Sequence, residues 1–398
     1  MEFQYSSIVD SSTYDTEGLC DGIDLRKSNF AFLEDRGIIR AQQDWAKYVG
    51  PLHDNLFRGS MGPRYSYISV GIPECLPERL EILAYANEFG FLYDDIFEAI
   101  TDPEKSTIEN NKLLGAFHEG VQSGQIIQDP ESERGGWRKL QSKILHDLLA
   151  IDREGAINIV KAWAEYNQQQ HRNFSTLEEY FPYRLKNAAA RIWTEFILFA
   201  MGLKLSAPER AKAEDLTRPA YFALVLQNDL YSWEREYREA QAQALNDEQS
   251  QSIDVTNMMN AIWVLMQEHN HLDIAGAQEL CRIKIKQYTT EYIQIVENVK
   301  GDQSLSVDLV KYVEALKYDI VGQAAWCMTC PRNHPDISFT EEQLEWMRGV
   351  VLPVAESGTP NSKALKVRSA LSDSTTRMPI VASNRKMSLA KSHSGTEH

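Results

Sequence analysis

Three oxygen-bearing side chains follow one another at four-residue steps in the stretch QNDLYSWERE, residues 227–236. Asn228, Ser232 and Glu236 fall on one slowly drifting stripe of a helix, after the apolar run YFALVL at 221–226. Their amide, hydroxyl and carboxylate oxygens are the kind of ligand that Mg²⁺ prefers. The spacing therefore predicts a magnesium-binding stripe just beyond an apolar helix segment.

Two further acidic residues of this stretch lie off the stripe. We expect Asp229 and Glu234 to point elsewhere, and their loss to matter less than the loss of a stripe residue. The alternative interpretation of the whole stretch is a helix that emerges from the core into water, because acidic residues on helices usually form a solvated face.

A second acidic cluster lies in FLYDDIFEAI, residues 91–100. Asp94 and Glu98 share one helix face, while Asp95 lies about 100 degrees round the helix. Carboxylates in an apolar segment are costly unless a cation takes up their charge. Because Phe91 precedes Asp94 by one turn, we interpret the cluster as metal ligands at the end of a partly aromatic wall. Two such helices facing each other across a cavity would hold several ions and a diphosphate.

The composition is that of a globular protein. The chain has 398 residues, 43% of them hydrophobic, which is enough apolar material for a sizeable core. Its apolar runs fall far short of the roughly 18 residues that span a bilayer, and its N-terminus lacks a basic start and an apolar signal core. We therefore expect a soluble cytoplasmic protein without stable membrane insertion. A formal net charge of −16 disfavours nucleic acid as a partner.

Cysteine and histidine residues give weaker signals. The five cysteines are an odd and widely scattered set, which argues against a disulfide framework. Cys327-x-x-Cys330 has no second pair beside it, so small buried thiols are favoured over a zinc or redox site. His269 and His271 in QEHNHLD are favoured as loop residues between helices rather than as metal ligands.

Helical periodicity dominates the chain, and strand-like alternation is nearly absent between residues 30 and 350, which predicts an all-α fold. The clearest helix begins with Pro77, which suits a first helical turn, and continues to Ile100. The spacing predicts further helices at 108–122, 132–150, 154–170, 174–203, 207–240, 253–268, 271–299, 305–329 and 340–350. Thr340 and Gln343 form a capping-box pattern at the start of the last one.

The composition changes after the last predicted helix. Residues 357–398 contain seven basic and two acidic residues, many Ser and Thr, and hardly an aromatic side chain. This composition is typical of a disordered tail or an interdomain linker. We therefore divide the chain into a helical domain at 1–356 and a tail at 357–398.

The two acidic clusters resemble the paired metal-binding motifs of class I terpene cyclases, here Asp94-Asp95-x-x-Glu98 and Asn228-Asp229-x-x-Ser232-x-x-x-Glu236. The stretches LEDRGIIRAQQDW, GPRYSYISVGIPECLPERLE and NAIWVLMQEH are similar to the cyclase half of fungal bifunctional diterpene synthases, and the resemblance extends across residues 1–350. It implies a helical bundle around a central cavity. It also implies fusion, through a polar linker, to a downstream prenyltransferase domain, absent here, that is able to drive oligomerisation. The cyclase part alone would be a monomer or a dimer.

The resemblance implies a role for each motif residue. Of three Mg²⁺ ions, those at the first motif would have Asp94 as their principal carboxylate ligand, with Asp95 and Glu98 as supporting residues. Asn228, Ser232 and Glu236 would chelate a further ion. Arg184 in YFPYRLKNAAA matches the arginine that senses the substrate diphosphate, and Arg332 in TCPRNHPD matches the arginine of a C-terminal Arg-Tyr pair. Arg235 stands where the family often has a Lys. Three arginines and three Mg²⁺ ions would explain how so acidic a chain binds an anion.

Two positions depart from the family pattern. Asn333 stands where a Tyr would complete the pair with Arg332, and it can donate to a diphosphate only from a shorter side chain. Asn187 stands where related cyclases often carry an Asp that is linked to the sensing arginine. Because an amide cannot pair ionically with Arg184, the sequence leaves the organisation of Arg184 open.

Aromatic and apolar residues near the motifs are candidates for the cavity wall, since aromatic faces tolerate the positive charge of a carbocation. Phe91 is the strongest candidate. Weaker candidates, for which ordinary helical core is an equal alternative, are Tyr65, Phe89, Tyr221 and Trp326. Leu224 and Val225 lie one turn before Asn228 and would set the width of the cavity.

The resemblance implies Mg²⁺-dependent ionisation of geranylgeranyl diphosphate and cyclisation to a fusicoccane-type (5-8-5) diterpene hydrocarbon, with diphosphate released. Three alternatives stay open. A sesterterpene cyclase would take geranylfarnesyl diphosphate. A prenyl diphosphate synthase would carry a second Asp-rich motif in place of the motif at 228–236. A non-catalytic isoprenoid-binding domain would fit the departures at Asn187 and Asn333, but not the intact metal motifs.

Overall fold

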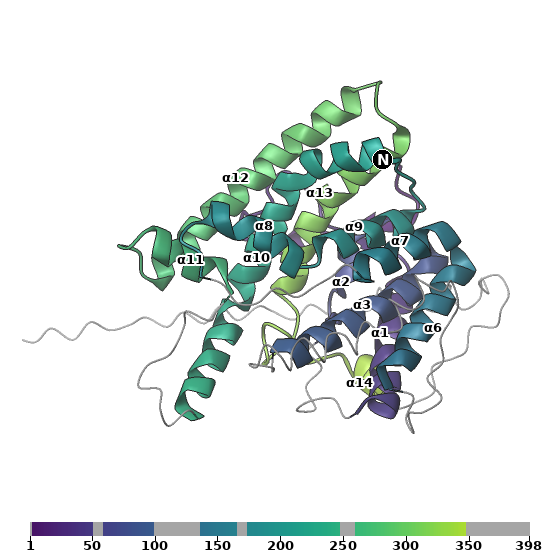
Figure 1. The fold of residues 1–398 in the computed structure, drawn as a ribbon, viewed down its shortest axis with the longest axis horizontal. Helices are drawn as coiled ribbons and strands as arrows, with labels where there is room; N and C mark the ends of the chain where they lie inside the picture. Colours follow the sequence, from purple (N-terminus) through teal and green to yellow (C-terminus); the bar gives the residue numbers. More distant parts are fainter. Residues whose placement is uncertain (1, 51–58, 99–135, 165–172, 247–258, 348–398) are drawn as a thin grey trace, which may run out of the picture. The chain divides into compact units, whose positions relative to one another are not determined.

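The structure is a computed structural model that describes residues 2–50, 59–98, 136–164, 173–246 and 259–347. It is built almost wholly of helices, as Figure 1 shows, which confirms the predicted all-α fold. The first helices are α1 (Ala31–Tyr48), α2 (Tyr67–Gly71), α3 (Pro77–Glu98), α6 (Gly136–Ile151) and α7 (Arg153–Ala164). They are followed by α8 (Leu177–Asn187), α9 (Ala190–Met201), α10 (Ala207–Asn246), α11 (Ala261–Glu268), α12 (Ile274–Gly301), α13 (Val307–Cys327) and α14 (Glu341–Met347).

A small antiparallel pair of strands precedes the helices. β1 (Ser6–Ile8) pairs with β2 (Arg26–Ser28), with Ser6 opposite Ser28, and the short 3-10 helix η1 (Ser11–Thr13) lies between them. The Arg26 guanidinium donates to the Ser6 hydroxyl at 2.9 Å. This side-chain bond adds to the backbone pairing across the two strands.

Most of the predicted helices are confirmed within a few residues. The predicted segments at 77–100, 132–150, 207–240, 271–299, 305–329 and 340–350 correspond to α3, α6, α10, α12, α13 and α14. The capping box is confirmed, because Gln343 N donates to Thr340 Oγ1 at 3.2 Å and Thr340 N donates to Gln343 Oε1 at 3.1 Å. The helix predicted at 108–122 lies outside the described residues, as do 165–170 and 253–258 of two others.

Two helices, α1 and α2, were not predicted. The buried face of α1 carries Glu34, Gly37 and Gln42 among its apolar residues, so its hydrophobic period is interrupted. A Cβ atom on Gly37 would lie only 2.2 Å from the carbonyl oxygen of Glu81 in α3. The glycine is therefore required by the close packing of α1 against α3, a contact that periodicity does not report.

The single helix predicted at 174–203 is wrong, because the chain breaks there into α8 and α9. Ala189 takes a left-handed backbone conformation with φ of 55°, which costs a non-glycine residue about 1–2 kcal/mol. Local propensity favours a continuous helix through NAAARIW, so tertiary contacts must impose the break. One such contact is the bonding of Arg184, in the last turn of α8, to α10.

The helix α13 lies at the centre of the described helices and packs against α2, α9, α10 and α12 (Figure 1). Almost every residue from Tyr312 to its end is buried. A Cβ atom on Gly322 would meet the Val70 carbonyl oxygen at 2.1 Å, so α2 and α13 are in direct backbone contact there. Side chains on α13 are therefore placed to reach several other helices at once.

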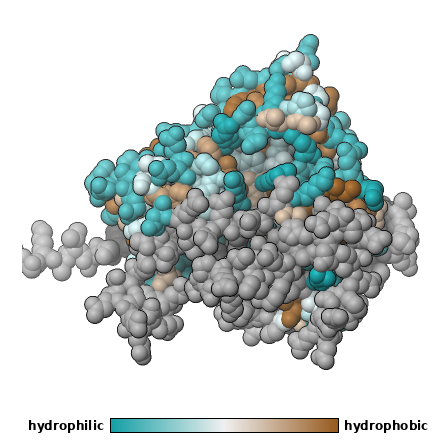
Figure 2. All heavy atoms as spheres, viewed as in Figure 1, coloured by the Kyte–Doolittle hydropathy of each residue, from teal (hydrophilic) through white to brown (hydrophobic). Residues whose placement is uncertain are grey.

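The surface and the cysteines agree with the composition. Figure 2 shows hydrophilic side chains over most of the coloured surface. All five cysteines are buried and free, which confirms their interpretation as buried thiols. Within the described ranges, none of the helices combines the length and the apolar character needed to cross a membrane.

The chain divides into two units, Met1–Val350 and Val351–His398. Every helix given above lies within the first unit. The predicted tail at 357–398 lies outside the described residues, so the boundary at 356 stays a prediction.

Candidate active site at α3, α10 and α13

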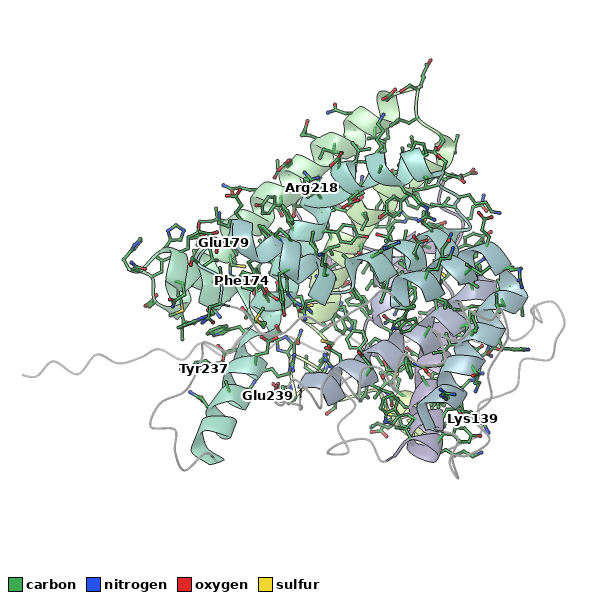
Figure 3. All side chains as sticks on the ribbon, viewed as in Figure 1. Lys139, Phe174, Glu179, Arg218, Tyr237 and Glu239 are labelled. Atoms are coloured by element: carbon green, nitrogen blue, oxygen red, sulfur yellow. The ribbon has the colours of Figure 1, made fainter. Side chains whose placement is uncertain are left out.

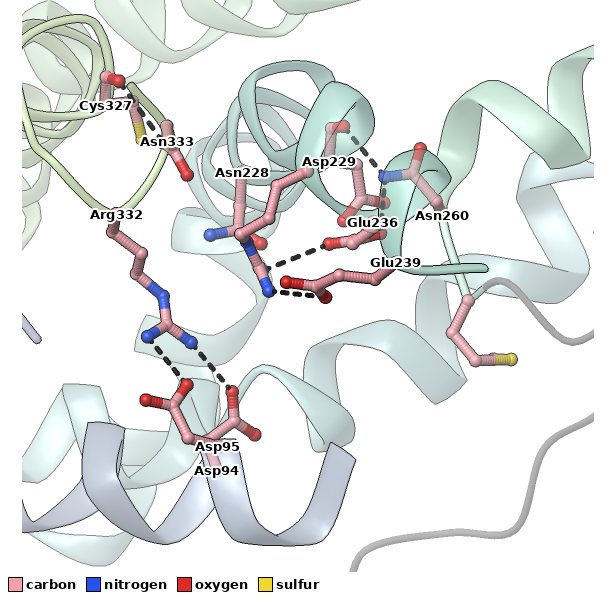
Figure 4. Close-up of polar contacts among 12 residues, drawn as sticks. Asp94, Asp95, Asn228, Asp229, Glu236, Glu239, Asn260, Cys327, Arg332 and Asn333 are labelled. Atoms are coloured by element: carbon pink, nitrogen blue, oxygen red, sulfur yellow. Dashed lines mark hydrogen bonds and ion pairs between the residues drawn. The ribbon is translucent and has the colours of Figure 1, made fainter. Parts of the chain in front are cut away.

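Asp94 and Asp95 of the first acidic cluster form ion pairs with Arg332. Arg332 Nη1 lies 2.8 Å from Asp95 Oδ1, and Arg332 Nη2 lies 3.6 Å from Asp94 Oδ2 (Figure 4). The same guanidinium lies over the Phe91 ring, 5.0 Å from its centroid. The Arg332 side chain is only 6% exposed, whereas the side chains of Asp94 and Asp95 are 42% and 29% exposed, so a buried guanidinium pairs with carboxylates that stay open to solvent. Glu98 ends α3, but its side chain lies outside the described part of the chain.

The second cluster places its three oxygen-bearing side chains along α10. Asn228 Oδ1 accepts a hydrogen bond from Arg184 Nη2 at 2.7 Å. Glu236 Oε2 accepts one from Asn260 Nδ2 at 3.0 Å. Between them, the Ser232 hydroxyl is buried and has no hydrogen-bond partner among the residues that the structure describes. Asn228 and Glu236 are thus held by hydrogen bonds, while the hydroxyl of Ser232 between them could still bind a ligand.

This arrangement fits a hard metal ion. An unpartnered buried hydroxyl costs about 1–3 kcal/mol, and an ion held by Asn228, Ser232 and Glu236 would satisfy it. In the described part of the chain, no three His, Cys, Asp or Glu side chains form a metal-binding group by themselves. The donor set on α10 differs from such a group because it mixes amide, hydroxyl and carboxylate oxygens, which suits Mg²⁺.

Arg184 is fixed by Asp229, which lies off the stripe of Asn228, Ser232 and Glu236, as expected. Asp229 Oδ1 accepts from Arg184 Nε at 3.0 Å and from Nη2 at 2.7 Å. Asp229 Oδ2 accepts from the Tyr180 hydroxyl at 2.8 Å and from Ala261 N at 2.9 Å. Burial opposes the charge of Arg184, but the Asp229 carboxylate raises the pKa of the guanidinium above its ordinary value. By contrast, Glu234 is exposed, as expected.

Asn187 answers the question that the sequence leaves open for Arg184. Its side-chain oxygen accepts a hydrogen bond from Arg184 Nη1, so the amide keeps the link without an ionic pair. Asn187 is the last residue of α8, directly before the break at Ala188 and Ala189. The arginine therefore connects the α8–α9 break to α10.

Asn260 is a site residue that sequence reasoning missed. Its amide Nδ2 donates to the Asp229 carbonyl oxygen at 2.8 Å and to Glu236 Oε2, as Figure 4 shows. Its Oδ1 accepts from Ile262 N at 2.9 Å and caps α11. The signal was an Asn directly before the apolar run AIWVLM, which is an N-cap pattern.

Arg235 is paired on its own helix. Its Nη1 lies 3.3 Å from Glu239 Oε2 and its Nη2 lies 3.6 Å from Glu236 Oε1. Figure 3 labels Glu239 and Tyr237 on the same part of α10. The Arg235 side chain is 12% exposed, so it lies close to a candidate ligand in a partly dehydrated position.

Asn333 lies beside Arg332 but bonds elsewhere. Its amide Nδ2 donates to the Cys327 carbonyl oxygen at 3.2 Å, and its backbone N donates to the Cys330 carbonyl oxygen at 3.3 Å (Figure 4). The side chain thus closes the C-terminal end of α13. The amide NH₂ group has a second N–H, so this bond by itself does not prevent the predicted contact with diphosphate.

Phe91 and Trp326 belong to one aromatic cluster. Their ring centroids are 5.8 Å apart, and Trp326 is 4.9 Å from Tyr67. Tyr67 in turn stacks on Trp193 at 4.8 Å with an interplanar angle of 12°. Tyr67 and Trp193 were not predicted, because only the packing of α2 and α9 against α13 brings them to Trp326.

The other wall candidates have different surroundings. Phe89 is fully buried between Trp45 at 5.9 Å and Trp163 at 5.8 Å, so it is helical core. Tyr65 is buried beside the cations of Lys27 and Arg64.

The candidates on α10 are all buried. The Tyr221 hydroxyl bonds Thr194 Oγ1 at 2.6 Å and the Tyr312 hydroxyl at 3.2 Å. Leu224 and Val225 are 5% and 4% exposed, one turn before Asn228 as predicted. Their place on α10 is therefore as expected, while their contact with a substrate stays a prediction.

Comparisons with known proteins agree on one family. The model of terpene synthase family 2, C-terminal metal binding, matches residues 85–291. The chain is 42% identical to fusicoccadiene synthase of Phomopsis amygdali, over 87% of this chain and 47% of that protein. It is 36% identical to a bifunctional sesterterpene synthase of Talaromyces wortmannii, over 84% of this chain and 43% of that protein. The chain thus spans less than half the length of either relative.

A solved structure shares the fold. Aristolochene synthase from Penicillium roqueforti superimposes with a TM-score of 0.58 at 19% identity. The likeness covers 76% of this chain and 95% of that structure. It identifies the helical fold as that of the class I terpene synthases.

Proposed function

The chain belongs to the terpene synthase family, and we propose that it is a class I terpene cyclase that ionises and cyclises geranylgeranyl diphosphate. The observation that carries the proposal is the 2.7 Å hydrogen bond from Arg184 Nη2 to Asn228 Oδ1. It brings a candidate diphosphate donor against a candidate metal ligand from another helix. A metal diphosphate requires such a pairing, because the ion and the donor act on the same phosphate oxygens.

We propose three Mg²⁺ ions as cofactors, held by the two acidic clusters. Asn228, Ser232 and Glu236 would hold one ion, and the unpartnered Ser232 hydroxyl supports this assignment. Asp94 and Asp95, with Glu98, would hold the others. When bound, Mg²⁺ supplies positive charge that stabilises the diphosphate as it leaves.

The cations of the chain itself would bind and orient the diphosphate. Arg184 is held by Asp229, Asn228 and Asn187, and these bonds leave one Nη1 N–H that would donate to the diphosphate. Arg332 contacts Asp94 and Asp95, so it would exchange at least one of these contacts for a phosphate oxygen. Arg235 would contribute a third guanidinium.

The aromatic cluster would act at the hydrocarbon end of the substrate. Phe91 offers a ring face next to Arg332, and Tyr67 and Trp193 extend this surface. Trp326 is 2% exposed and packs against Phe91 and Tyr67. Such faces exclude water and stabilise a passing carbocation by cation–π attraction. Leu224 and Val225 would limit the width of the cavity from α10.

The favoured product is a fusicoccane-type diterpene hydrocarbon, which the 42% identity to fusicoccadiene synthase supports. The second candidate is a sesterterpene cyclase acting on geranylfarnesyl diphosphate. It is supported by the 36% identity to a sesterterpene synthase. Because that relative is described as bifunctional, we also propose that this chain corresponds to the cyclase part of a two-domain enzyme, with 357–398 as the linker to a prenyltransferase.

The test is incubation of the purified chain and Mg²⁺ with the C10, C15, C20 and C25 prenyl diphosphates in separate reactions, followed by mass-spectrometric analysis of the hydrocarbons. A cyclic C20 hydrocarbon is the expected result. Turnover of the C25 substrate alone would select the sesterterpene cyclase. Failure to turn over any of the four would refute a cyclase and favour a non-catalytic isoprenoid-binding domain.

A further inference from the structure

Two polar side chains on one stripe of α13 each anchor an aromatic ring, and a third residue on the stripe carries a ring of its own. Asp319, Gln323 and Trp326 are spaced by four and three residues, so they share one helix face. Asp319 Oδ2 accepts from Trp193 Nε1 at 2.7 Å. Gln323 Oε1 accepts from the Tyr67 hydroxyl at 2.9 Å. The Trp326 indole itself donates to the Ser60 carbonyl oxygen at 2.8 Å.

The anchored rings form one continuous surface. Trp193 stacks on Tyr67, Tyr67 lies 4.9 Å from Trp326, and Trp326 lies 5.8 Å from Phe91. The Ser60 carbonyl oxygen accepts from the Trp326 indole and also from Tyr67 N at 3.1 Å, which locks two of the rings together. The polar edge of each anchored ring is thus bonded to the protein, which leaves the ring faces for other contacts.

Three of the four rings keep accessible surface, while Trp326 is 2% exposed. Trp193, Tyr67 and Phe91 are only half-buried. At the same time, burial raises the pKa of the Tyr67 phenol well above its ordinary value. The described part of the protein therefore does not cover these three side chains completely, so part of each ring is accessible to a substrate.

Asp319 lies behind this surface in an unusual state. It is fully buried, and its Oδ1 has no hydrogen-bond partner in the structure. A Cβ atom on Gly71 of α2 would lie 2.8 Å from that oxygen, so the helix backbone closes over the carboxyl group. A buried carboxyl group with an idle oxygen is costly, and its one bond is to the Trp193 indole. The burial raises the pKa of this carboxyl group to about 8.

We propose that Asp319 is a positioning residue for the cyclisation, which fixes the Trp193 indole against Tyr67 and thereby selects among products. The inference rests on the proposed function. It extends that function because Asp319 belongs to neither metal motif and acts only through Trp193. Without the acceptor, the indole is free to rotate about its side-chain bonds. The cation would then meet a different aromatic face, and competing ring closures would change their ratio.

The activity test compares Asp319→Leu, which removes the acceptor, with Asp319→Asn, which keeps an oxygen for the indole N–H. For Asp319→Leu and for Trp193→Phe we expect the ratio of minor to major hydrocarbon to change about tenfold or more, with KM changed less than about threefold. Asp319→Asn should restore a ratio close to that of the unchanged chain. Glu314→Gln is the matched control, because it removes a carboxylate from the same helix that pairs with Lys300. It should leave the ratio unchanged.

A second readout does not depend on turnover. In protein labelled with ¹⁵N-tryptophan, the Trp193 indole N–H signal, assigned by its loss in Trp193→Phe, should lie downfield in the unchanged chain and in Asp319→Asn. It should move upfield in Asp319→Leu. If Asp319→Leu does not fold, the contrast between Trp193→Phe and Asp319→Asn in product ratio decides.

The results separate the two claims. An unchanged product ratio in Asp319→Leu or in Trp193→Phe, in an active enzyme, would overturn the positioning role and leave the cyclase intact. The positioning role would also be overturned if Asp319→Asn changed the product ratio as much as Trp193→Phe does. If the unchanged chain converts no prenyl diphosphate, the proposed function is refuted, and so is the role of Asp319 in cyclisation. The indole signal then tests only the hydrogen bond between Asp319 and Trp193.

Discussion

Asp229→Asn should lower the free energy of unfolding by about 3–5 kcal/mol, because it leaves the buried Arg184 charge without its ionic partner. The magnitude follows from the bonds that the carboxylate makes. Asp229 is fully buried and accepts four hydrogen bonds, two from Arg184 and one each from Tyr180 and Ala261. An amide of the same shape has one acceptor oxygen, so at least one group of donors loses its acceptor at about 1–3 kcal/mol.

The matched control is Glu234→Gln, five residues along the same helix. Glu234 is exposed, so the same change of charge should alter stability by no more than about 0.5 kcal/mol. Urea unfolding followed by circular dichroism measures both variants, with a common slope required for the comparison. In a chain that already carries Arg184→Met, Asp229→Asn should lower the free energy of unfolding by less, because the Arg184 charge that it would leave unpaired is absent.

Two outcomes would refute this reasoning. One is an Asp229→Asn variant as stable as Glu234→Gln, and the other is an equal cost with and without Arg184. Either result would mean that the buried pair does not fix the arginine. We also expect Asp229→Asn to lower kcat/KM for the prenyl diphosphate, whereas Glu234→Gln should not.

Further predictions concern the stripe and the buried carboxyl group. Asn228→Ala should abolish or greatly reduce cyclisation while the helical circular dichroism is retained, and retained activity would show that the second metal motif is misassigned. Ser232→Ala should stabilise the metal-free chain by up to about 1–3 kcal/mol, because it removes an unpartnered buried hydroxyl. It should also raise the Mg²⁺ concentration needed for half-maximal turnover. A destabilised variant with unchanged Mg²⁺ dependence would contradict this. The pKa of Asp319 is raised to about 8 in the folded chain, so the folded state keeps a proton that the unfolded state releases above about pH 4. Between about pH 4 and pH 8, the unchanged chain should therefore lose stability relative to Asp319→Asn by up to about 1.4 kcal/mol per pH unit, as measured in urea titrations. A stability difference independent of pH would argue against a buried neutral carboxyl group.

The stripe on α10 could be predicted from sequence because the helix alone sets the spacing of its residues. Asn228, Ser232 and Glu236 need only a continuous helix to share a face, and α10 is continuous there. Asp229 could not be assigned in this way. Its partner Arg184 lies 45 residues earlier, on a helix whose position depends on the packing of α8 against α10.

Other features depend on contacts that override local preference. The α8–α9 break at Ala189 contains no glycine or proline, so the helix propensity of the local sequence favours a continuous helix. Tertiary contacts break it there. Tyr67 and Trp193 come from helices without a motif, and they meet only because α13 brings Gln323 and Asp319 to them. Predicting the aromatic surface from sequence would have required the packing of α2, α9 and α13.

The most direct test of the account is incubation of the purified chain with geranylgeranyl diphosphate, once with Mg²⁺ and once with the ion removed by a chelator. Hydrocarbon products and released diphosphate are measured in both reactions. We expect a cyclic C20 hydrocarbon with an equal amount of diphosphate, in the presence of Mg²⁺ only. Cyclisation that persists without the metal, or no cyclic product with it, would contradict the assignment of the two acidic clusters as a magnesium diphosphate site.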